Sequence, residues 1–367
     1  MDGNKKKILA VFTNTTAGLY IFRNELLSSL SENYDIRVLS TNTGRIEDLE
    51  KIGCRITEIK MDKRGANPFK DMQLMRVYKK FIRETKPSYV INYTIKPDIY
   101  GGIVCRKCGI PYSNNITGLG TAFDRGGLLQ KIVEFLYKKG CKKAVTVFFE
   151  NSGNAEVFLS KKLITPEQAV VLNGAGVNLT RFAFTEYPED DSVTHFLFMG
   201  RIMKEKGIEE LFEAAERLHK NNFAFSLDVL GSYVEDYKPL IDKYTEQGWL
   251  HYYGFQKDVK PFIEKCNCFV LPSWHEGMAN TNLESAAMGR PVITSNIPGC
   301  REAVINGESG LLCERQNADD LYEKLVEFIQ LPYEQKRIMG VKGRKHVENC
   351  FDKVKVVKNT IDALHLN

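Results

Sequence analysis

Short apolar runs alternate with helix-length amphipathic segments along the whole chain, and this alternation limits the possible folds most strongly. Runs that are apolar at nearly every position, and that helices separate, are typical of parallel strands covered by helices on both faces. The pattern predicts two tandem doubly wound, Rossmann-like α/β domains. The predicted strands are 8–13, 36–40, 89–93 and 145–150 in the first half, and 195–200, 225–230, 268–272 and 291–295 in the second.

The chain length supports two domains, because 367 residues exceed what one hydrophobic core usually covers. The polar stretch "YPEDDS" (187–192) precedes a fresh strand–helix–strand series. We therefore expect an N-terminal domain over 1–187, a C-terminal domain over 192–350, and a C-terminal helix over 351–367 that returns to the N-terminal domain. Ligands of such sheets bind beyond the carboxyl ends of the strands, so we expect the two domains to face each other across an active-site cleft.

The charge is unevenly distributed. Residues 1–190 contain 29 Lys and Arg against 20 Asp and Glu, whereas the whole chain has a net charge of +5. A basic first half is typical of a protein that faces an anionic partner, either nucleic acid, an anionic membrane surface or a phosphate-bearing substrate. No zinc-finger, RRM-like or helix-turn-helix pattern supports nucleic acid. The N-terminus shows no signal-peptide pattern, which predicts a cytoplasmic protein.

Several cofactor and metal classes lack their motifs. The pair Cys105 and Cys108 has no second ligand pair at zinc spacing, so we expect no metal site and free thiols at the nine cysteines. The chain contains no P-loop, no Gly-x-Gly-x-x-Gly after the first strand, and no Asp-x-Asp after an apolar strand. These absences argue against a P-loop enzyme, an NAD-dependent enzyme and a carboxylate-bound divalent ion.

Polar and small residues follow three of the predicted strands. Gly18 lies at a strand-to-helix turn, and Arg201 and Lys206 follow the strand 195–200. The stretch "HEGMANTNLESAAMGRP" (275–291) follows the strand 268–272 and contains Glu276 and Glu284. A basic loop and a helix N-terminus at one sheet edge favour diphosphate binding. The structural alternatives are a solvated basic loop, and a capping box in which Thr281 caps the helix and Glu284 reaches back.

These segments together resemble the family 4 glycosyltransferases, which are retaining enzymes of the two-domain GT-B fold. The likeness extends over nearly the whole chain. It is carried by "GLYIFRNELLSSL" (18–30), "KPDIYGG" (96–102), "ITGLG" (116–120), "VLNGAGVNLTRF" (171–182), "FMGRIMKEKGIEEL" (198–211) and "HEGMANTNLESAAMGRPVITSNIPGCREAV" (275–304). The last is the most specific, since it matches the Glu-x7-Glu element of the family. More narrowly, the chain is similar to bacterial enzymes that extend lipid-linked oligosaccharides for capsule, O-antigen or protein glycosylation.

The resemblance implies a role for each matching residue at the donor site. Glu284 would bind the ribose hydroxyls of a nucleotide sugar, and Glu276 would contact hydroxyls of the transferred sugar. Arg201 and Lys206 would neutralise the leaving diphosphate without a metal ion. The further donor-site candidates are Gly18, Gly277 and Ala279, which permit close approach, and the amides from Met278 through Asn280 to Thr281.

On the acceptor side the resemblance implies Lys96, Thr117 and Gly118. Many members of the family carry a histidine in the loop that matches "ITGLG", where this chain has Leu119, and none of its six histidines lies in residues 1–194. This departure leaves open which group, if any, replaces the histidine. Retention in the family is usually explained by front-face attack, with a donor phosphate oxygen accepting the proton of the acceptor.

The resemblance therefore predicts a retaining, metal-independent hexosyl- or N-acetylhexosaminyltransferase that requires no cofactor. Its expected donor is a UDP-sugar, and its expected acceptor is a polyprenyl-diphosphate-linked glycan. Two alternatives remain, a non-hydrolysing UDP-sugar epimerase and a catalytically silent glycosyltransferase-like partner subunit.

The segment "RGGLLQKIVEFLYKKGCKK" (125–143) combines apolar residues at helical spacing with a basic end. Either it is a core-facing helix with a solvated terminus, or it holds the first domain against anionic lipid headgroups. The second reading predicts peripheral association with the inner face of the plasma membrane. The apolar residues are Leu128, Leu129, Ile132, Val133 and Leu136, and the lysines are Lys138, Lys139, Lys142 and Lys143.

Overall fold

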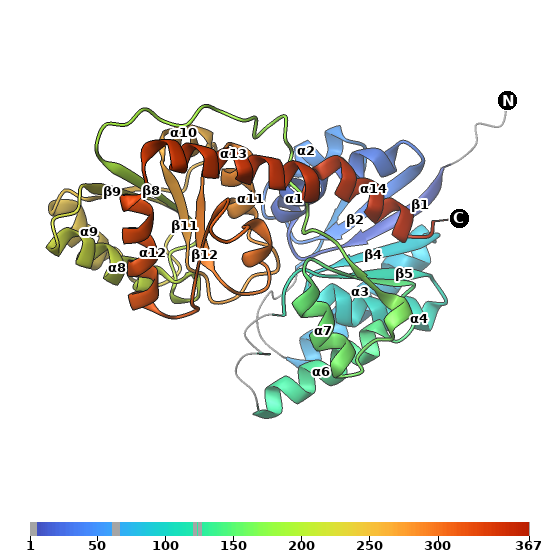
Figure 1. Cartoon of the computed structure of the whole chain (residues 1–367). Helices are drawn as coiled ribbons and strands as arrows, with labels where there is room; N and C mark the ends of the chain where they lie inside the picture. The colour runs from blue at the N-terminus through green and yellow to red at the C-terminus, as the bar shows by residue number, and fades with distance from the viewer. Residues whose placement is uncertain (1–5, 61–66, 120–122, 124–126, 367) are drawn as a thin grey trace. The chain divides into compact units, whose positions relative to one another are not determined.

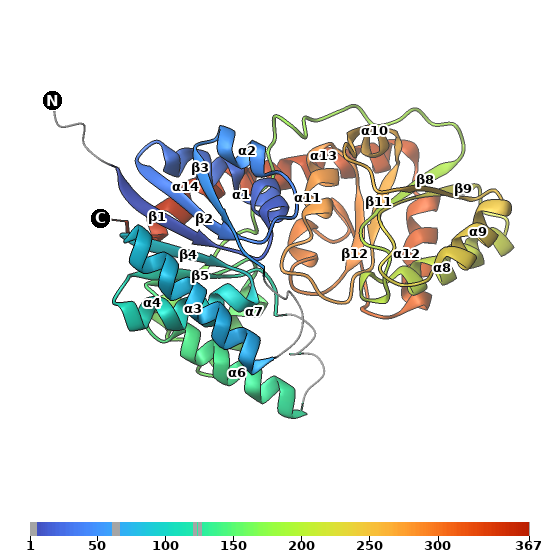
Figure 2. The ribbon, with the colours of Figure 1, turned by 180° about the vertical axis from the view of Figure 1, so that it is seen from behind.

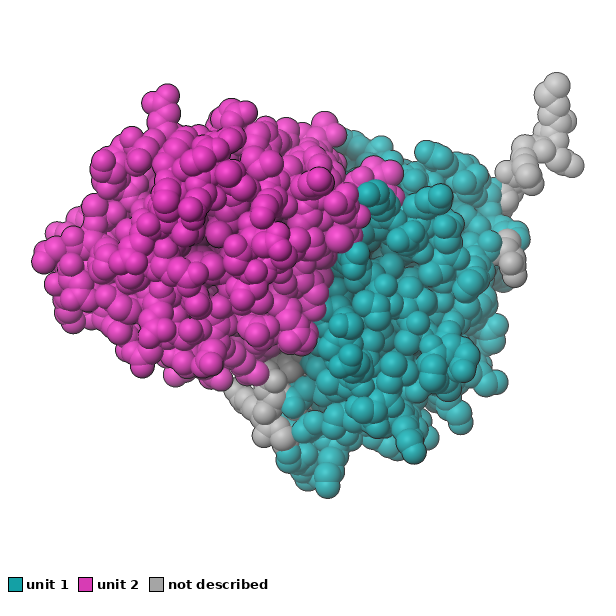
Figure 3. Space-filling model, in the orientation of Figure 1, with its two compact units in different colours: residues 1–175, 355–367 teal, residues 176–354 magenta. Residues whose placement is uncertain are grey.

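The computed structural model describes residues 6–60, 67–119, 123 and 127–366. The chain forms two compact units, which Figure 3 colours separately: unit 1 comprises residues 1–175 and 355–367, and unit 2 comprises residues 176–354. Each unit contains one fully parallel sheet with helices on both faces (Figure 1). The prediction of two doubly wound α/β domains is confirmed, and all eight predicted strands are present.

Unit 1 has a seven-stranded sheet in the order β3-β2-β1-β4-β5-β6-β7. Its strands are β1 (Lys7–Phe12), β2 (Tyr34–Ser40), β3 (Cys54–Glu58), β4 (Tyr89–Tyr93), β5 (Tyr112–Ile116), β6 (Thr146–Phe149) and β7 (Ala169–Val171). Its helices are α1 (Thr16–Ser31), α2 (Ile46–Lys51), α3 (Pro68–Thr85), the π-helix η1 (Pro97–Gly101), α4 (Gly102–Cys108), α6 (Gly127–Cys141), α7 (Ser152–Ser160), the 3-10 turn η2 (Pro166–Gln168) and α14 (Lys353–Ala363) from residue 355 on.

The first strand shows how the sequence builds two helical layers around this sheet. Successive side chains of a strand point to opposite faces. Accordingly, Leu9 and Val11 lie in a buried cluster with α1, α2 and the end of α14. Ala10 and Phe12 lie in a second cluster with α3, α4, α6 and α7. An apolar run without alternation is therefore required, because both faces of the strand are buried.

Unit 2 has a six-stranded sheet in the order β10-β9-β8-β11-β12-β13. Its strands are β8 (Thr194–Met199), β9 (Phe225–Leu230), β10 (Leu250–Gly254), β11 (Cys268–Leu271), β12 (Val292–Ser295) and β13 (Gly310–Cys313). Its helices are α8 (Ile208–Lys220), α9 (Lys238–Glu246), α10 (Lys260–Lys265), α11 (Asn280–Ala287), α12 (Ala318–Gln330) and α13 (Tyr333–Cys350), with 3-10 turns at η3 (Lys204–Lys206) and η4 (Arg301–Ala303).

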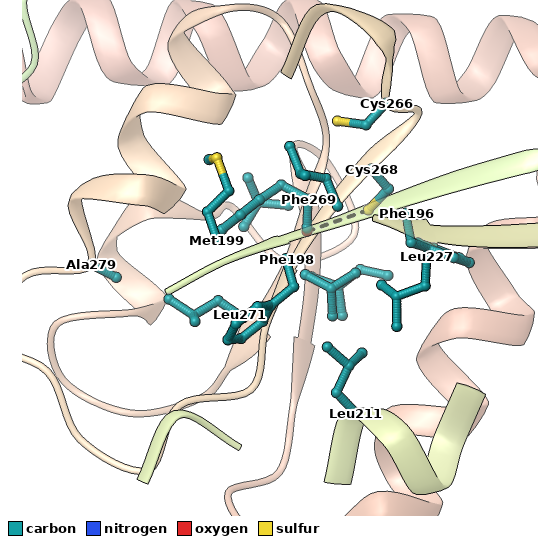
Figure 4. Close-up of a cluster of buried hydrophobic side chains, with 14 of the residues drawn as sticks. Phe196, Phe198, Met199, Leu211, Leu227, Cys266, Cys268, Phe269, Leu271 and Ala279 are labelled. Carbon is teal, nitrogen blue, oxygen red and sulfur yellow. Dashed lines mark hydrogen bonds between the residues drawn. The ribbon is translucent and has the colours of Figure 1, made fainter. Parts of the chain in front are cut away.

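The core of unit 2 reaches the start of α11. Figure 4 shows Phe198 and Met199 at the end of β8, Leu271 at the end of β11, and Ala279, the residue before α11, in one buried cluster. The small side chain of Ala279 lets the backbone at the start of α11 approach the carboxyl ends of both strands. Helix α11 is thus fixed where ligands of such sheets bind.

The boundary between the units lies before the predicted stretch 187–192. Val177 and Phe182 are buried in the core of unit 2. The Tyr187 hydroxyl donates a hydrogen bond to the Asn267 carbonyl at 3.0 Å, which ties the polar stretch to the same unit. Composition indicated a linker at 187–192, but the hydrophobic contacts that assign the preceding residues to unit 2 are long-range.

Candidate active site

The loops that follow β8 and β11 leave the sheet of unit 2 at its topological switch point. Strands β8 and β11 are parallel neighbours, with Phe269 beside Leu197, although two other strands, β9 and β10, lie between them in the sequence. The strand order runs one way from β8 to β10 and the other way from β11 to β13, and such a reversal creates a crevice at the carboxyl ends. Arg201 and Lys206 lie in the first loop and Glu276 in the second.

Hydrogen bonds hold the two loops together. The backbone carbonyl of Glu205 accepts from the Trp274 amide at 3.0 Å and from the Ser273 hydroxyl at 3.2 Å. The indole Nε1 of Trp274 donates to the Glu210 carboxylate in α8 at 3.0 Å. Lys206, the residue after Glu205, is therefore held close to the loop that carries Glu276.

Two glycines allow the backbones around the site to touch. Gly207 has φ +72°, and a Cβ there would lie 2.0 Å from the Pro272 carbonyl oxygen. Gly299, in the loop after β12, has φ +88°, and a Cβ there would lie 2.7 Å from the carbonyl oxygens of both Glu276 and Gly277. Any side chain at either position would displace a loop, so three loops are packed backbone to backbone around Glu276.

Lys206 and Glu276 form an ion pair at the switch point, in which Nζ donates to Oε1. Their side chains are only 17% and 13% exposed, so solvent screens the pair less than a surface salt bridge. Arg201 is exposed, and no described side chain or backbone group binds its guanidinium. The site thus combines a sheltered carboxylate, its paired ammonium and a free guanidinium.

The capping-box interpretation of "TNLE" is wrong. Helix α11 begins at Asn280, its N-cap residue is Ala279, and no side chain caps it. Thr281 is therefore already inside the first turn, and Glu284 lies one turn further along, too deep in the helix to reach back to a cap amide. Sequence patterns locate helix ends only to within a few residues, and here that shift removes the box.

The amides expected to face a diphosphate are only partly available. The Ala279 amide donates to the Gly299 carbonyl at 2.7 Å, so it does not point into the site. Met278 and Ala279 are buried at 5% and 3% exposure. The first-turn amides of Asn280 and Thr281 have no intrahelical acceptor, and the positive end of the helix dipole lies there. This end of α11 can bind an anion.

A buried polar network that the sequence analysis did not identify anchors α11. The Asn282 Nδ2 donates to the Thr294 hydroxyl at 3.0 Å, and that hydroxyl donates to the Leu271 carbonyl at 2.7 Å. Asn282 and Thr294 are fully buried. The network connects α11 to β12 and β11 and fixes the direction of the helix. Its sequence signal is an asparagine, Asn282, inside the first turn of α11.

Glu284 is half-buried, and its environment alters its acidity. Burial raises the pKa of Glu284 to about 7, while the nearby cations Arg181 and Lys353 oppose the increase. Both cations belong to unit 2 but lie far from Glu284 in sequence. Ionised, this carboxylate is a strong hydrogen-bond acceptor for hydroxyl groups.

The unit 1 candidates all follow strands at the carboxyl edge of their own sheet. Gly18 lies in the first turn of α1, where its amide donates to the capping hydroxyl of Thr15 at 3.1 Å. That amide is therefore used within the protein. Thr117 is exposed after β5, Gly118 has φ +152°, and Leu119 packs against the core rather than presenting a polar group. Gly120 of the same motif lies outside the described residues.

Lys96, after β4, is buried in a polar cluster. Its Nζ donates to the Asp71 carboxylate at 2.9 Å, and the Tyr100 hydroxyl donates to the other oxygen of that carboxylate at 2.7 Å. Lys96 is 9% exposed and Asp71 5%. The ion pair thus connects α3 with the segment after β4, and it was not predicted from the sequence.

Comparisons with known proteins agree with this architecture. The family model described as glycosyl transferases group 1 matches residues 181–346, and the one described as glycosyl transferase 4-like matches residues 7–151. Among solved structures, a glycosyltransferase from Rickettsia africae superimposes with a TM-score of 0.79 at 19% identity and covers 98% of both chains. The Anabaena protein HepE, solved in complex with UDP and glucose, has a TM-score of 0.78 at 13% identity and covers 98% of this chain and 99% of its own.

Two curated relatives extend over most of the chain. The Campylobacter jejuni N,N'-diacetylbacillosaminyl-diphospho-undecaprenol alpha-1,3-N-acetylgalactosaminyltransferase is 26% identical, covering 86% of this chain and 88% of its own. The Escherichia coli UDP-Gal:alpha-D-GlcNAc-diphosphoundecaprenol alpha-1,3-galactosyltransferase is 26% identical, covering 90% and 89%.

Two Rossmann-like units, each built on one parallel sheet, form the GT-B fold, which the similar solved structures share. The chain belongs to the family 4 glycosyltransferases, with a glycosyl transferase 4-like first half and a group 1 second half. The family predicted from the sequence motifs is confirmed.

Proposed function

We propose that this glycosyltransferase moves a sugar from a UDP-sugar to a glycan carried on a polyprenyl diphosphate. The assignment of the donor rests on one observation, the Lys206–Glu276 ion pair beside the start of α11, which no side chain caps. The acceptor half is supported by the two curated relatives, whose names both contain an undecaprenyl-diphosphate-linked sugar as acceptor. The name of the E. coli relative also contains UDP-Gal as donor.

In this proposal the donor diphosphate binds between Lys206, Arg201 and the amides of Asn280 and Thr281. Lys206 would exchange its contact with Glu276 for the diphosphate, and the Glu276 carboxylate would then accept hydrogen bonds from the transferred sugar. Because negative charge grows on the diphosphate as the glycosidic bond breaks, cations fixed there stabilise the transition state. They would do so without a metal ion.

Glu284 would bind the ribose hydroxyls. Its carboxyl group titrates near neutrality, and hydroxyl donors favour its ionised form, so nucleotide binding should be coupled to the loss of a proton. The proposed roles of the two glutamates therefore differ: Glu284 holds the nucleoside, and Glu276 holds the sugar.

The bond changes follow a front-face route. The bond between the sugar C1 and the diphosphate oxygen breaks, and an acceptor hydroxyl oxygen bonds to C1 on the same face. The hydroxyl proton passes to an oxygen of the departing UDP, so the configuration at C1 is retained. Lys96, Thr117 and Gly118 at the carboxyl edge of unit 1 are the proposed acceptor-side residues.

An assay with purified protein tests the proposed function. With UDP-sugars and a short polyprenyl-diphosphate-linked acceptor, we expect sugar transfer and UDP release that persist in EDTA. Loss of activity in EDTA with recovery in Mg²⁺ would contradict metal independence. Epimerised donor without acceptor would indicate an epimerase, and donor binding without turnover would indicate a silent partner subunit. Either result would overturn the proposal.

The same proposal places unit 1 at an anionic membrane surface. No helix among the described residues is long and apolar enough to span a membrane. In α6, Val133 and Leu136 pack partly against the core. Leu128 and Phe135, in contrast, are 75% and 58% exposed. One side of α6 therefore packs against the core, and another side is exposed. Residues 125–126 of the predicted segment lie outside the described residues.

The basic end of α6 forms a hollow that suits anionic headgroups. Lys138, Lys139 and Lys142 line it together with Lys162, which follows α7, and its volume is about 730 Å³. Lysines near an anionic surface each contribute about 1 kcal/mol to binding. Four such cations beside exposed apolar side chains could hold the unit at an interface.

Changing Lys138, Lys139, Lys142 and Lys143 to glutamine is expected to release the protein from anionic vesicles and to slow transfer to a lipid-linked acceptor. Transfer to a short soluble acceptor should not change. Vesicle co-sedimentation at low salt measures the first effect. A matched control makes the same charge change at four exposed lysines of unit 2, Lys220, Lys257, Lys265 and Lys345, and should stay bound. Equal release of both variants, or wild-type protein that ignores anionic vesicles, would contradict the membrane-facing surface.

A further inference from the structure

Unit 1 contains a groove between α3, α4 and α6, the helices on one face of its sheet (Figure 2). Its volume is about 600 Å³. The apolar lining comes from all three helices: Met72 and Met75 of α3, Val104 of α4, and Ile132 and Leu136 of α6. The groove lies entirely within unit 1 and shares no residue with the donor site of unit 2.

Two of the lining side chains are unusually exposed. Met72 is 47% exposed and Ile132 is 45% exposed. Just outside the groove, Phe69 at the start of α3 and Leu128 at the start of α6 are 76% and 75% exposed. Large apolar side chains that are exposed inside a groove, as Met72 and Ile132 are, are typical of a binding site for an apolar ligand.

The later turns of α3 and α4 add positive charge to the same groove. The cations are Arg76, Lys79 and Lys107, which line the groove and are all exposed. Among the described residues, none of these three cations pairs with a carboxylate. Met72 and Lys79 are about 10 Å apart along the helix, given the rise of an α-helix. The groove therefore passes from an apolar stretch to a cluster of unpaired cations within a short distance.

Asp71 is the acid that lines the groove, and its charge is compensated. Its carboxylate is 5% exposed and accepts hydrogen bonds from Lys96 and Tyr100. An anion in the groove would therefore meet the cations without an opposing free carboxylate. Through Lys96, the same wall connects to the segment after β4, where the proposed acceptor-side residues begin.

We propose that this groove binds the lipid part of the acceptor, with the isoprenoid chain against Met72, Met75, Ile132 and Leu136 and the diphosphate at Arg76, Lys79 and Lys107. The ligand class follows from complementarity: the groove requires a ligand that is apolar along one stretch and anionic at its end. An isoprenoid diphosphate has this form. The inference rests on the proposed function for the identity of the lipid and adds a saturable site for a single lipid chain.

Calorimetric titration of the full chain with farnesyl diphosphate, farnesol and inorganic diphosphate tests the site. Farnesyl diphosphate should bind most tightly, because only it satisfies both halves of the groove. The double variant Met72→Glu/Ile132→Glu should weaken its binding by at least about tenfold, since it places charge against the chain. Arg76→Gln/Lys79→Gln should weaken farnesyl diphosphate binding but leave farnesol binding unchanged.

The control variant Phe69→Glu/Leu128→Glu makes the same changes on the same two helices outside the groove, and should bind farnesyl diphosphate as wild type does. Equal losses in the two glutamate variants would show general adsorption and overturn the proposal. So would equal affinity of wild-type protein for inorganic diphosphate and farnesyl diphosphate. A far-UV circular dichroism spectrum and a thermal unfolding transition like those of the wild type confirm that each variant is folded.

Activity of the wild-type protein separates this inference from the proposed function. Transfer to a lipid-linked acceptor without farnesyl diphosphate binding would overturn the groove alone. Binding of farnesyl diphosphate that depends on the groove, without any sugar transfer, would overturn the proposed function and leave a lipid site.

Discussion

Lys206→Ala is expected to lower kcat/KM by about a hundredfold or more, which corresponds to about 3 kcal/mol of lost transition-state stabilisation. The ammonium group would no longer meet the charge that grows on the leaving diphosphate. The variant would also leave the Glu276 carboxylate, which is 13% exposed, without its cation beside an anionic donor. Both effects act in the same direction. Arg201→Ala removes the other proposed diphosphate cation and should reduce turnover similarly.

Lys204 provides a matched control for Lys206. It lies in the same short turn, η3, but is exposed and pairs with Glu209 at 2.9 Å. Lys204→Ala should therefore change steady-state kinetics by no more than about twofold, as expected for a surface ion pair. Comparable losses of kcat/KM in both variants would mean that activity depends on the overall positive charge of the turn rather than on Lys206. Unchanged kinetics in Lys206→Ala would show that Lys206 does not stabilise the transition state.

Arg290→Met is expected to reduce the free energy of unfolding of unit 2 by about 3–5 kcal/mol. The Arg290 side chain is fully buried, and its guanidinium donates to backbone carbonyls from three segments. The acceptors are Ile263 at 3.0 Å, Glu264 at 2.8 Å, Thr185 at 3.0 Å, Glu186 at 2.9 Å and Met288 at 2.9 Å. Methionine fills a similar volume but removes the guanidinium donor from all five carbonyls.

Urea unfolding followed by tryptophan fluorescence measures this loss selectively, because both tryptophans, Trp249 and Trp274, belong to unit 2. Arg337→Met is the control, since the Arg337 side chain is 38% exposed and, among the described residues, forms a salt bridge only with Glu334 at 2.7 Å. We expect a change within about 0.5 kcal/mol there. An Arg290→Met variant as stable as the control would show that the network is dispensable.

Most of the strands that the sequence predicted have apolar side chains on both faces, whereas β2 and β9 alternate apolar with polar residues over part of their length. Of the strands that it missed, β3, β7, β10 and β13 form the sheet edges. The edge strand β10 alternates buried and exposed residues, and β7 has only three residues. Edge strands are covered less completely, so their sequences need less apolar character.

The other missed strand, β5, is central but polar. Its sequence is "YSNNI", and all five residues are buried. The Asn92 Nδ2 of β4 donates to Asn114 Oδ1 at 2.9 Å, and the Asn115 Nδ2 donates to the Asn92 carbonyl at 3.0 Å. Buried asparagines are compatible with a central strand only when partners on other elements satisfy them, and one sequence does not reveal those partners.

The same distinction applies to the donor site. The loops with Arg201, Lys206 and Glu276 could be placed from the sequence, because each directly follows a recognisable strand. Their pairing, the support from Gly299, and the cations near Glu284 depend on contacts between distant segments. The family resemblance implied that the Ala279 amide faces the diphosphate. This was wrong for the same reason, since the amide donates to the Gly299 carbonyl.

The central claim, that the start of α11 and its two glutamates bind a nucleotide sugar, is tested most directly by calorimetric titration of UDP into Glu284→Gln and Glu276→Gln. We expect Glu284→Gln to weaken UDP binding and Glu276→Gln to keep near wild-type affinity while losing turnover. Because burial raises the pKa of Glu284 to about 7, wild-type affinity should rise between pH 6 and 8 as the carboxyl ionises, by up to about tenfold relative to Glu284→Gln. Equal affinities in both variants and the wild type, with no difference in pH dependence, would contradict the assignment of this site.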